Sequence, residues 1–224
     1  MKCAIMQPHY LPWPGYFNLM SQVDKFIFLD DAQYSKNSWH NRNIIINNTK
    51  KIWLTIPLKK SSINTSIKDK LIDDEKKWRK KHIKTLFQCY SKHSHATDLD
   101  EFISFLQDLR YENLSDCNIK IIIFIAKKLN INTEFLNTSD FSINEKRTQK
   151  LIKILEKVDA KEYISPLGGK EYLIEDSFQK YSSVKLTINN YKNKKYNQKN
   201  SKEFISNLSI VDAIANSGWI GAAK

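Results

Sequence analysis

The sequence has few of the residues that cross-link or interrupt a chain. It contains only three cysteines, five glycines and five prolines among its 224 residues. Cys3, Cys89 and Cys117 form no CxxC pair, so the sequence predicts neither a disulfide framework nor a zinc site and favours a reducing, cytoplasmic compartment. The low glycine and proline content argues against a disordered or low-complexity chain.

Long hydrophobic runs are also missing. The most apolar segment, 119–126, is interrupted by Lys120 and is shorter than the roughly 20 residues that span a bilayer. The first eight residues lack the basic and then apolar pattern of a signal peptide, which Pro8, Pro12 and Pro14 would also interrupt. We therefore expect a soluble protein with at most a peripheral membrane association.

Acidic residues are outnumbered by basic ones. The 36 Lys and Arg against 24 Asp and Glu give a formal net charge of +12. This excess favours an anionic partner such as a nucleotide, a phospholipid surface, a lipid-linked diphosphate sugar or an RNA. Lysines on a surface also need no partner, because charge alone keeps a protein soluble, and we assign most of them to that role. Nucleic acid is not an expected partner, although a tRNA donor would reveal itself by a steep salt dependence of binding.

Several enzyme motifs are absent. The sequence has no HExxH, no GxSxG and no protein-kinase set, and its GGK at 168–170 lacks the Walker spacing. His82, His93 and His95 have no convincing ligand spacing, so no metal is expected, and the sequence names no cofactor. Cys3 lies in a predicted buried strand, which disfavours it as a nucleophile.

Strands and helices alternate along the chain. Strands are predicted at 2–7, 25–29, 132–136, 161–164 and 184–188, and a β-hairpin at 43–58. Helices are predicted at 15–23, 73–90, 97–110, 115–129, 145–158, 172–178 and 209–215. The pattern predicts an α/β fold with a Rossmann-like βαβ core, a mostly parallel sheet, a β-hairpin and a helical insert at roughly 73–130. We expect one domain over residues 1–224.

Three unusual segments follow predicted strands. They are 7–17, 30–42 and 165–169. Ligands of open α/β sheets bind at the carboxyl ends of strands, where strand order reverses. We therefore expect a crevice with the first two segments as opposite walls and Gly168 and Gly169 as its floor.

The first segment, QPHYLPWPGYF, holds three of the five prolines. Pro12 and Pro14 fix the backbone around Trp13, so a site here would be preorganised. His9 supplies an imidazole for acid or base chemistry, and Gly15 opens a helix whose amides suit a phosphate or carboxylate. Alternatively, the aromatic residues only cap the core. The candidate site residues are His9 as a catalytic group and Gln7, Tyr10, Trp13, Gly15 and Tyr16 for substrate binding.

The second segment begins with two acids and continues with ten hydrogen-bonding or aromatic residues. Asp30 and Asp31 are candidate catalytic groups, because a carboxylate at a strand end can orient an amine or accept a proton. Lys36 and Arg42 are expected to clamp an anion, and Trp39 to stack on a sugar or base. Simple strand-end polarity and a solvated loop remain the alternatives. The substrate-binding candidates are Gln33, Tyr34, Lys36, Trp39, Asn41 and Arg42.

The third segment, YISPLGGKEYL, has the shape of an anion-binding turn before a helix. Gly168, Gly169 and Lys170 are its substrate-binding candidates. A GGK tripeptide alone is a weak signal, so this segment gains weight only from its place after a strand.

Five stretches together resemble the WbqC-like family over about residues 3–215. They are QPHYLPWPGYF, DKFIFLDDAQYSKNSWHNRN, WLTIPLKK, YISPLGGKEYL and FISNLSIVDAI. The end, ANSGWIGAAK, departs from the pattern. The family's members resemble products of O-antigen (lipopolysaccharide) and related surface-polysaccharide clusters, and the resemblance implies transfer of an amino-acyl group, such as glycyl, to a sugar. A fainter similarity connects LPWPGY with HIGH-motif nucleotidyltransferases, but Trp13 and Tyr16 stand where those enzymes have histidines.

We therefore expect a transferase of surface-glycan biosynthesis. Its acceptor would be a small-molecule or lipid-linked phosphorylated sugar and its donor an amino-acyl or other acyl compound. Two alternatives stay open, a nucleotidyltransferase-like enzyme that activates its acid with ATP and a non-catalytic nucleotide- or glycan-binding protein.

Overall fold

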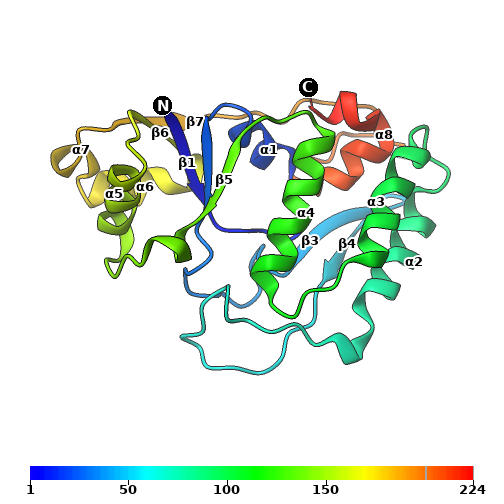
Figure 1. The fold of residues 1–224 in the computed structure, drawn as a ribbon. Coiled ribbons are helices and arrows are strands. Elements are labelled where there is room, and N and C mark those ends of the chain that lie inside the picture. Colours follow the sequence, from blue (N-terminus) through cyan, green and yellow to red (C-terminus); the bar gives the residue numbers. More distant parts are fainter. Residues whose placement is uncertain (200, 224) are drawn as a thin grey trace.

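A five-stranded sheet forms the centre of the molecule. The computed structural model describes residues 1–199 and 201–223, and Figure 1 shows their arrangement. The strands are β1 (Lys2–Met6), β2 (Lys25–Phe28), β5 (Glu134–Asn137), β6 (Glu162–Pro166) and β7 (Lys185–Asn189). They lie in the order β5-β2-β1-β6-β7, and every neighbouring pair is parallel. The predicted α/β class and parallel sheet are confirmed.

Both faces of this sheet are buried, which explains why its strands read as continuous apolar runs. Ala4, Phe26 and Phe28 point to the larger hydrophobic core. Their neighbours in the chain, including Ile5 and Ile27, point to a smaller core on the other face. Side chains alternate between the two faces because successive residues of a strand point in opposite directions.

Helices cover the two faces unequally. The larger core involves α1 (Pro14–Met20), α2 (Trp78–Tyr90), α3 (Ala96–Asp108), α4 (Leu114–Lys128) and α8 (Ile210–Ala223). The smaller core involves α5 (Arg147–Lys157), α6 (Lys170–Glu175) and α7 (Phe178–Tyr181), which lie together in Figure 1. Three 3₁₀ turns complete the helical elements: η1 (Asp74–Lys76), η2 (Thr138–Phe141) and η3 (Leu167–Gly169).

The predicted hairpin forms a second, antiparallel sheet. Its strands are β3 (Arg42–Asn47) and β4 (Lys50–Thr55). The Tyr90 hydroxyl accepts a hydrogen bond from the backbone N–H of Ile46, and the backbone N–H of Ser209 donates to the carbonyl of Ile44. The hairpin therefore packs with α2 and with the start of α8.

Three predicted helix boundaries were wrong. The helix expected at 73–90 starts as η1 and is interrupted at Lys77, whose φ of 49° is left-handed. The helix expected at 172–178 is split into α6 and α7 at Ser177, with a φ of 54°. The last helix was expected to end at 215, but α8 runs to Ala223 as two helical stretches on either side of a kink at Gly218, whose φ of 69° and ψ of 176° are not helical.

The strand order creates a switch point. From β1 the chain moves outward through β2 to β5, and it then returns to the other side of β1 for β6 and β7. The loops after β1 and β6 therefore diverge from the adjacent carboxyl ends of two neighbouring strands. Doubly wound sheets bind their ligands at this point.

Candidate functional site

A cavity of about 400 Å³ opens at the switch point. We call it the switch-point cavity. Met6 and Pro166, the last residues of β1 and β6, contribute to its wall. The predicted position at the carboxyl ends of the strands thus coincides with a hollow large enough for a small ligand.

The lining is aromatic and amide-rich. It contains the rings of Trp13, Trp39 and Tyr191 and the side chains of Asn43, Asn189 and Asn207, together with His9. None of the described lining residues is an Asp, Glu, Lys or Arg. Such a wall offers flat apolar faces and neutral hydrogen-bonding groups, but no fixed charge.

The Trp13 ring has defined neighbours on two sides. Its ring meets that of Tyr191 edge-on, with centroids 5.3 Å apart. A Cβ added at Gly15 would lie 2.3 Å from the indole, so only glycine lets the ring lie across the start of α1. Trp13 therefore fills the side of Gly15 where a Cβ would be, and Gly15 still lines the switch-point cavity.

His9 is the imidazole of this cavity. Its side chain makes no hydrogen bond with any residue of 1–199 or 201–223, and its ring lies 5.7 Å from those of Tyr16 and His40. Burial, and secondarily the neighbouring His40, lower the pKa of His9 to about 3. The imidazole is therefore neutral at pH 7, with its ring nitrogens free for a ligand.

His40 joins the first two segments. Its Nδ1 accepts a hydrogen bond from the backbone N–H of Ser35, so its Nε2 carries the proton and donates to Gln7 Oε1 at 3.0 Å. Burial lowers the pKa of His40 to about 4, which keeps this arrangement neutral.

Two asparagines strengthen the same junction. Asn118 Nδ2 donates to the carbonyls of Pro8 and His40, at 3.0 and 2.7 Å. Asn43 Nδ2 donates to the carbonyls of Tyr10 and Leu11. Segments 7–17 and 30–42 are thus joined directly, and both contribute to the switch-point cavity, the first through His9 and Trp13 and the second through Trp39.

Tyr10 and Tyr16 lie in the core. The Tyr10 hydroxyl bonds His82 Nδ1 at 2.8 Å, and the Tyr16 hydroxyl donates to the carbonyl of Gln7. Burial raises the pKa of both phenols well above the ordinary value. Both side chains pack in the core beneath the 7–17 segment and do not line the switch-point cavity.

Asp30 and Asp31 lie outside the switch-point cavity. Asp30 accepts hydrogen bonds from the Thr138 hydroxyl and from the N–H and hydroxyl of Ser139. Asp31 accepts from Thr138 and pairs with Lys150 Nζ at 2.6 Å. Both carboxylates therefore hold the turn η2 against the end of β2.

A second cavity, of about 590 Å³, collects the remaining candidates of the second segment. We call it the basic cavity. Tyr34, Lys36, Asn41 and Arg42 line it, together with residues of the 58–63 loop and Lys70. Gln33 holds this loop, because its amide donates to the carbonyl of Ile63.

The glycine segment is divided between different roles. Gly168 lines the switch-point cavity, and a Cβ there would meet nothing within 4 Å. Gly169 is buried, and a Cβ would lie 2.5 Å from Ser165 Oγ. Lys170 is exposed at the start of α6 and belongs to neither cavity.

The WbqC-like protein family model matches residues 7–223 of this chain. The chain belongs to the WbqC-like family. The match includes most of the tail that we expected to diverge. Within 1–199 and 201–223, no helix is both long and apolar enough to cross a bilayer.

A relative of this WbqC-like chain occurs in Mycobacterium tuberculosis (strain ATCC 25618 / H37Rv). The uncharacterized protein Rv1507c is 31% identical over 220 residues, which cover 97% of this chain and 94% of that protein. No solved structure is significantly similar to the chain.

Several residues that line or support the switch-point cavity escaped prediction. Applying the carboxyl-end rule to β7 as well would have pointed to Asn189 and Tyr191. The roles of Asn43 and Asn118 could not be predicted, because an asparagine in a strand or helix is seen to join two segments only when its hydrogen-bond partners are known. No group of three or more His, Cys, Asp or Glu in the described part of the chain is arranged to hold a metal ion.

Proposed function

We propose that this protein is a transferase of surface-glycan biosynthesis that moves an amino-acyl or related acyl group onto a sugar held in the switch-point cavity. The observation that supports this proposal is the charge-free lining of aromatic rings and amides. Aromatic faces pack on the C–H face of a sugar ring, and asparagine side chains both donate to and accept from hydroxyls.

His9 is the proposed catalytic residue. Acyl transfer forms a bond between an amine or hydroxyl of the sugar and the acyl carbon, and it breaks the bond from that carbon to the donor's leaving group. The proton that the amine or hydroxyl loses passes to the departing group or to solvent. A neutral imidazole accepts a hydrogen bond from the attacking N–H or O–H. This bond orients the lone pair of the attacking nitrogen or oxygen toward the acyl carbon. With a pKa of about 3, His9 is a weak base at pH 7, so its main contribution is orientation.

The lining also bears on the alternatives. A triphosphate needs cations or a phosphate-binding loop, and the described residues of the switch-point cavity supply no cation. The geometry therefore favours a sugar over ATP in this place. A glycan-binding protein without turnover would use the same lining, and only a rate measurement separates it from a transferase.

Calorimetric titration of the full chain with a panel of nucleotide sugars tests the binding step. We expect Trp13→Ala to lower the affinity for the sugar at least tenfold. The matched control is Tyr181→Ala, an exposed aromatic on α7 that leaves the affinity unchanged. Absence of sugar binding in the unmodified protein would refute the proposal.

Mass spectrometry of reactions with acyl and amino-acyl donors tests the transfer step. We expect a sugar product heavier by one acyl group, and loss of that product in His9→Ala. Tight sugar binding without product for any donor would support the non-catalytic alternative.

A further inference from the structure

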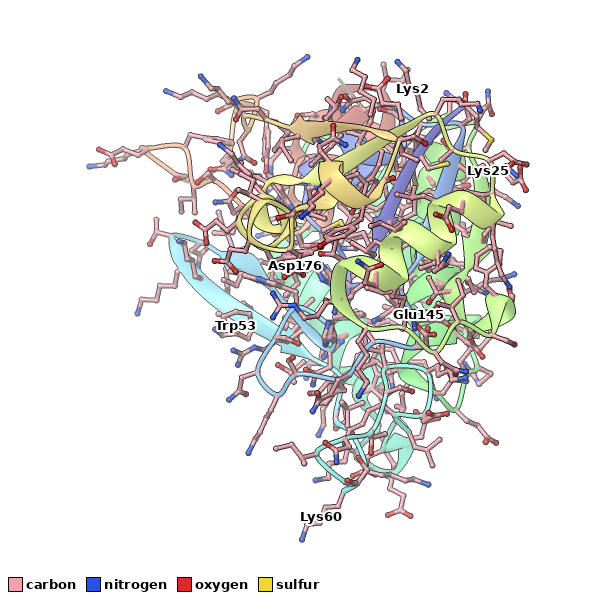
Figure 2. The ribbon with its side chains drawn as sticks, turned by 90° about the vertical axis from the view of Figure 1, so that its left-hand side faces the viewer. Lys2, Lys25, Trp53, Lys60, Glu145 and Asp176 are labelled. Atoms are coloured by element: carbon pink, nitrogen blue, oxygen red, sulfur yellow. The ribbon has the colours of Figure 1, made fainter. Side chains whose placement is uncertain are left out.

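We propose that the basic cavity is a binding site for a diphosphate group. Lys36, Arg42, Lys59, Lys60 and Lys70 line it, from three stretches of the chain. Lys36, Lys59 and Lys60 are exposed, whereas Arg42 is half-buried and Lys70 is buried. No Asp or Glu is among its described lining residues, and none of the five cations forms an ion pair with a carboxylate within 1–199 and 201–223. Figure 2 shows Lys60 on the loop at the lower edge of the molecule.

Gathering these charges is unfavourable without a counter-ion. Like charges repel, and the repulsion grows where solvent is excluded. The largely buried ammonium of Lys150, by contrast, has a carboxylate partner in Asp31. An anion in the cavity would remove this repulsion, whereas a ligand without charge would not.

Lys70 gives the strongest indication. Only 8% of its surface is exposed. Its ammonium donates to Ser61 Oγ and lies 5.1 Å from the ring centroid of Tyr34. These contacts are polar but carry no negative charge, and a buried ammonium is costly unless it is paired. Its remaining donors are available to a ligand oxygen.

Arg42 is also held with donors to spare. Its guanidinium lies 4.2 Å over the ring of Trp53 and donates to the backbone carbonyl of Asn37. Its Nε is buried without a partner among the described residues. A planar guanidinium fixed in this way can present two parallel N–H groups to one phosphate.

Backbone hydrogen bonds shape the cavity before any ligand arrives. The N–H of Tyr34 donates to the carbonyl of Thr65, and the N–H of Ile67 donates to that of Ala32. The N–H of Lys59 donates to the carbonyl of Leu71. The loop carrying three of the five cations is thus attached at several points, and little ordering cost opposes binding.

The number of cations favours two phosphoryl groups over one. A phosphoryl group carries about −1.5 to −2 charges at pH 7 when it is terminal, so a diphosphate matches several cations where one phosphate leaves most unpaired. The cavity of about 590 Å³ has room for such a group. A free pyrophosphate, a nucleoside diphosphate and a prenyl diphosphate share this chemistry.

Calorimetry of the full chain at one fixed ionic strength tests the site, with inorganic pyrophosphate, UDP and geranyl diphosphate as separate probes. We expect pyrophosphate to bind and to raise the melting temperature. Arg42→Gln and Lys70→Met should each weaken the binding of pyrophosphate at least tenfold. Lys84→Gln, which removes an exposed cation of α2 outside the cavity, should change the affinity less than twofold.

A second readout needs no ligand. Replacing Lys70 by methionine removes an uncompensated charge, so Lys70→Met should melt at a higher temperature than the unmodified protein. If that variant fails to fold, the double variant Lys59→Gln, Lys60→Gln keeps the binding test intact. The relative affinities of the three probes identify whether a nucleoside or a prenyl group accompanies the diphosphate.

Two results would overturn the inference. One is the absence of binding by all three probes, and the other is equal weakening by Lys84→Gln and Arg42→Gln, which would show only a general charge effect. Neither result depends on the proposed sugar in the switch-point cavity, because Trp13→Ala tests that cavity separately.

Discussion

The side chain of His9 is neutral, only partly exposed and without a hydrogen-bond partner among the described residues, and it lines the switch-point cavity. Because it holds nothing else in place, its removal should change function more than stability. We expect His9→Ala to lower the acyl-transfer rate at least tenfold while the melting temperature shifts by no more than a few degrees.

The two effects are measured by product formation and by thermal unfolding of the same preparation. His9→Gln is the matched control, since glutamine retains a hydrogen-bond acceptor and should recover part of the rate. A large loss of stability in His9→Ala would instead assign the imidazole to packing.

Asp30 shows the opposite behaviour. Its carboxylate accepts three hydrogen bonds from Thr138 and Ser139. We expect Asp30→Asn to lower the free energy of unfolding by about 1–3 kcal/mol, because an amide cannot accept all of these bonds and a buried donor is left unsatisfied. Urea denaturation measures this change.

The same variant separates structure from catalysis at this position. Product formation at a temperature well below the midpoint should stay near that of the unmodified protein. A rate reduced by orders of magnitude at unchanged stability would restore Asp30 as a catalytic group.

Single residues differ in how well sequence reveals them. Trp13 and Trp39 stood out because tryptophan is rare in solvated loops and prolines flank the first of them. Lys70 gave no signal, since a lysine in a polar loop is ordinarily solvated. Its burial depends on Tyr34 and Ser61, which reach it only in the folded chain.

At the scale of elements, Gly15 at the start of α1 determines where Trp13 lies in the wall of the switch-point cavity. A Cβ at position 15 would overlap the indole of Trp13, at 2.3 Å. We expect Gly15→Ala to displace this ring and weaken sugar binding at least fivefold, although alanine itself favours a helix by up to about 1 kcal/mol.

Gly168→Ala is the matched comparison. This glycine lines the same cavity, but a Cβ there would meet nothing within 4 Å. The stability of Gly168→Ala should therefore stay unchanged. Its affinity for the sugar should fall much less than the affinity of Gly15→Ala. Equal affinities for the two variants in calorimetry would contradict the assigned position of Trp13.

Elements were predicted well where apolar periodicity is strong. The β1-α1-β2 unit and α4 lie within a few residues of their predicted bounds, because buried strands and amphipathic helices leave clear patterns. The extension of α8 past 215 was missed. At Gly218 the backbone leaves the helical conformation, with a φ of 69°, and further helical residues follow to Ala223.

For the whole molecule, four histidines make stability depend on pH, because burial lowers the pKa of His93 as well as those of His9, His40 and His82. Burial lowers the pKa of His40 and His82 to about 4 and that of His9 to about 3, from an ordinary value of 6.5. Below pH 6.5 the unfolded chain binds protons that the folded chain does not. The free energy of unfolding should therefore fall as pH decreases from 6.5 toward 4.

The slope can reach about 1.4 kcal/mol per pH unit for each histidine. Urea denaturation at pH 7, 6 and 5 measures it. His40→Gln should reduce the slope contributed by the histidines by about a quarter to a third, because glutamine cannot take up the proton. A stability that is constant over this range would refute the neutral, buried state of these side chains.

The global arrangement was only partly predictable. Alternating strands and helices indicate a parallel sheet, and the carboxyl-end rule indicates where a ligand binds. Strand order was not predictable, since β5 and β6 are consecutive in the chain and yet lie on opposite sides of the pair β2-β1. Consequently the sequence did not show that the second segment is divided between two cavities.

The strand order also has a consequence for synthesis. The switch-point cavity needs Trp13 from the beginning of the chain and Tyr191 and Asn207 from near its end. A ribosome adds residues in order, and domains form as their segments emerge. A nascent chain stalled before Tyr191 would thus expose its proline-rich loop without the opposite wall. The cavity exists only once nearly the whole chain has been made, so an incomplete product would lack the proposed sugar site.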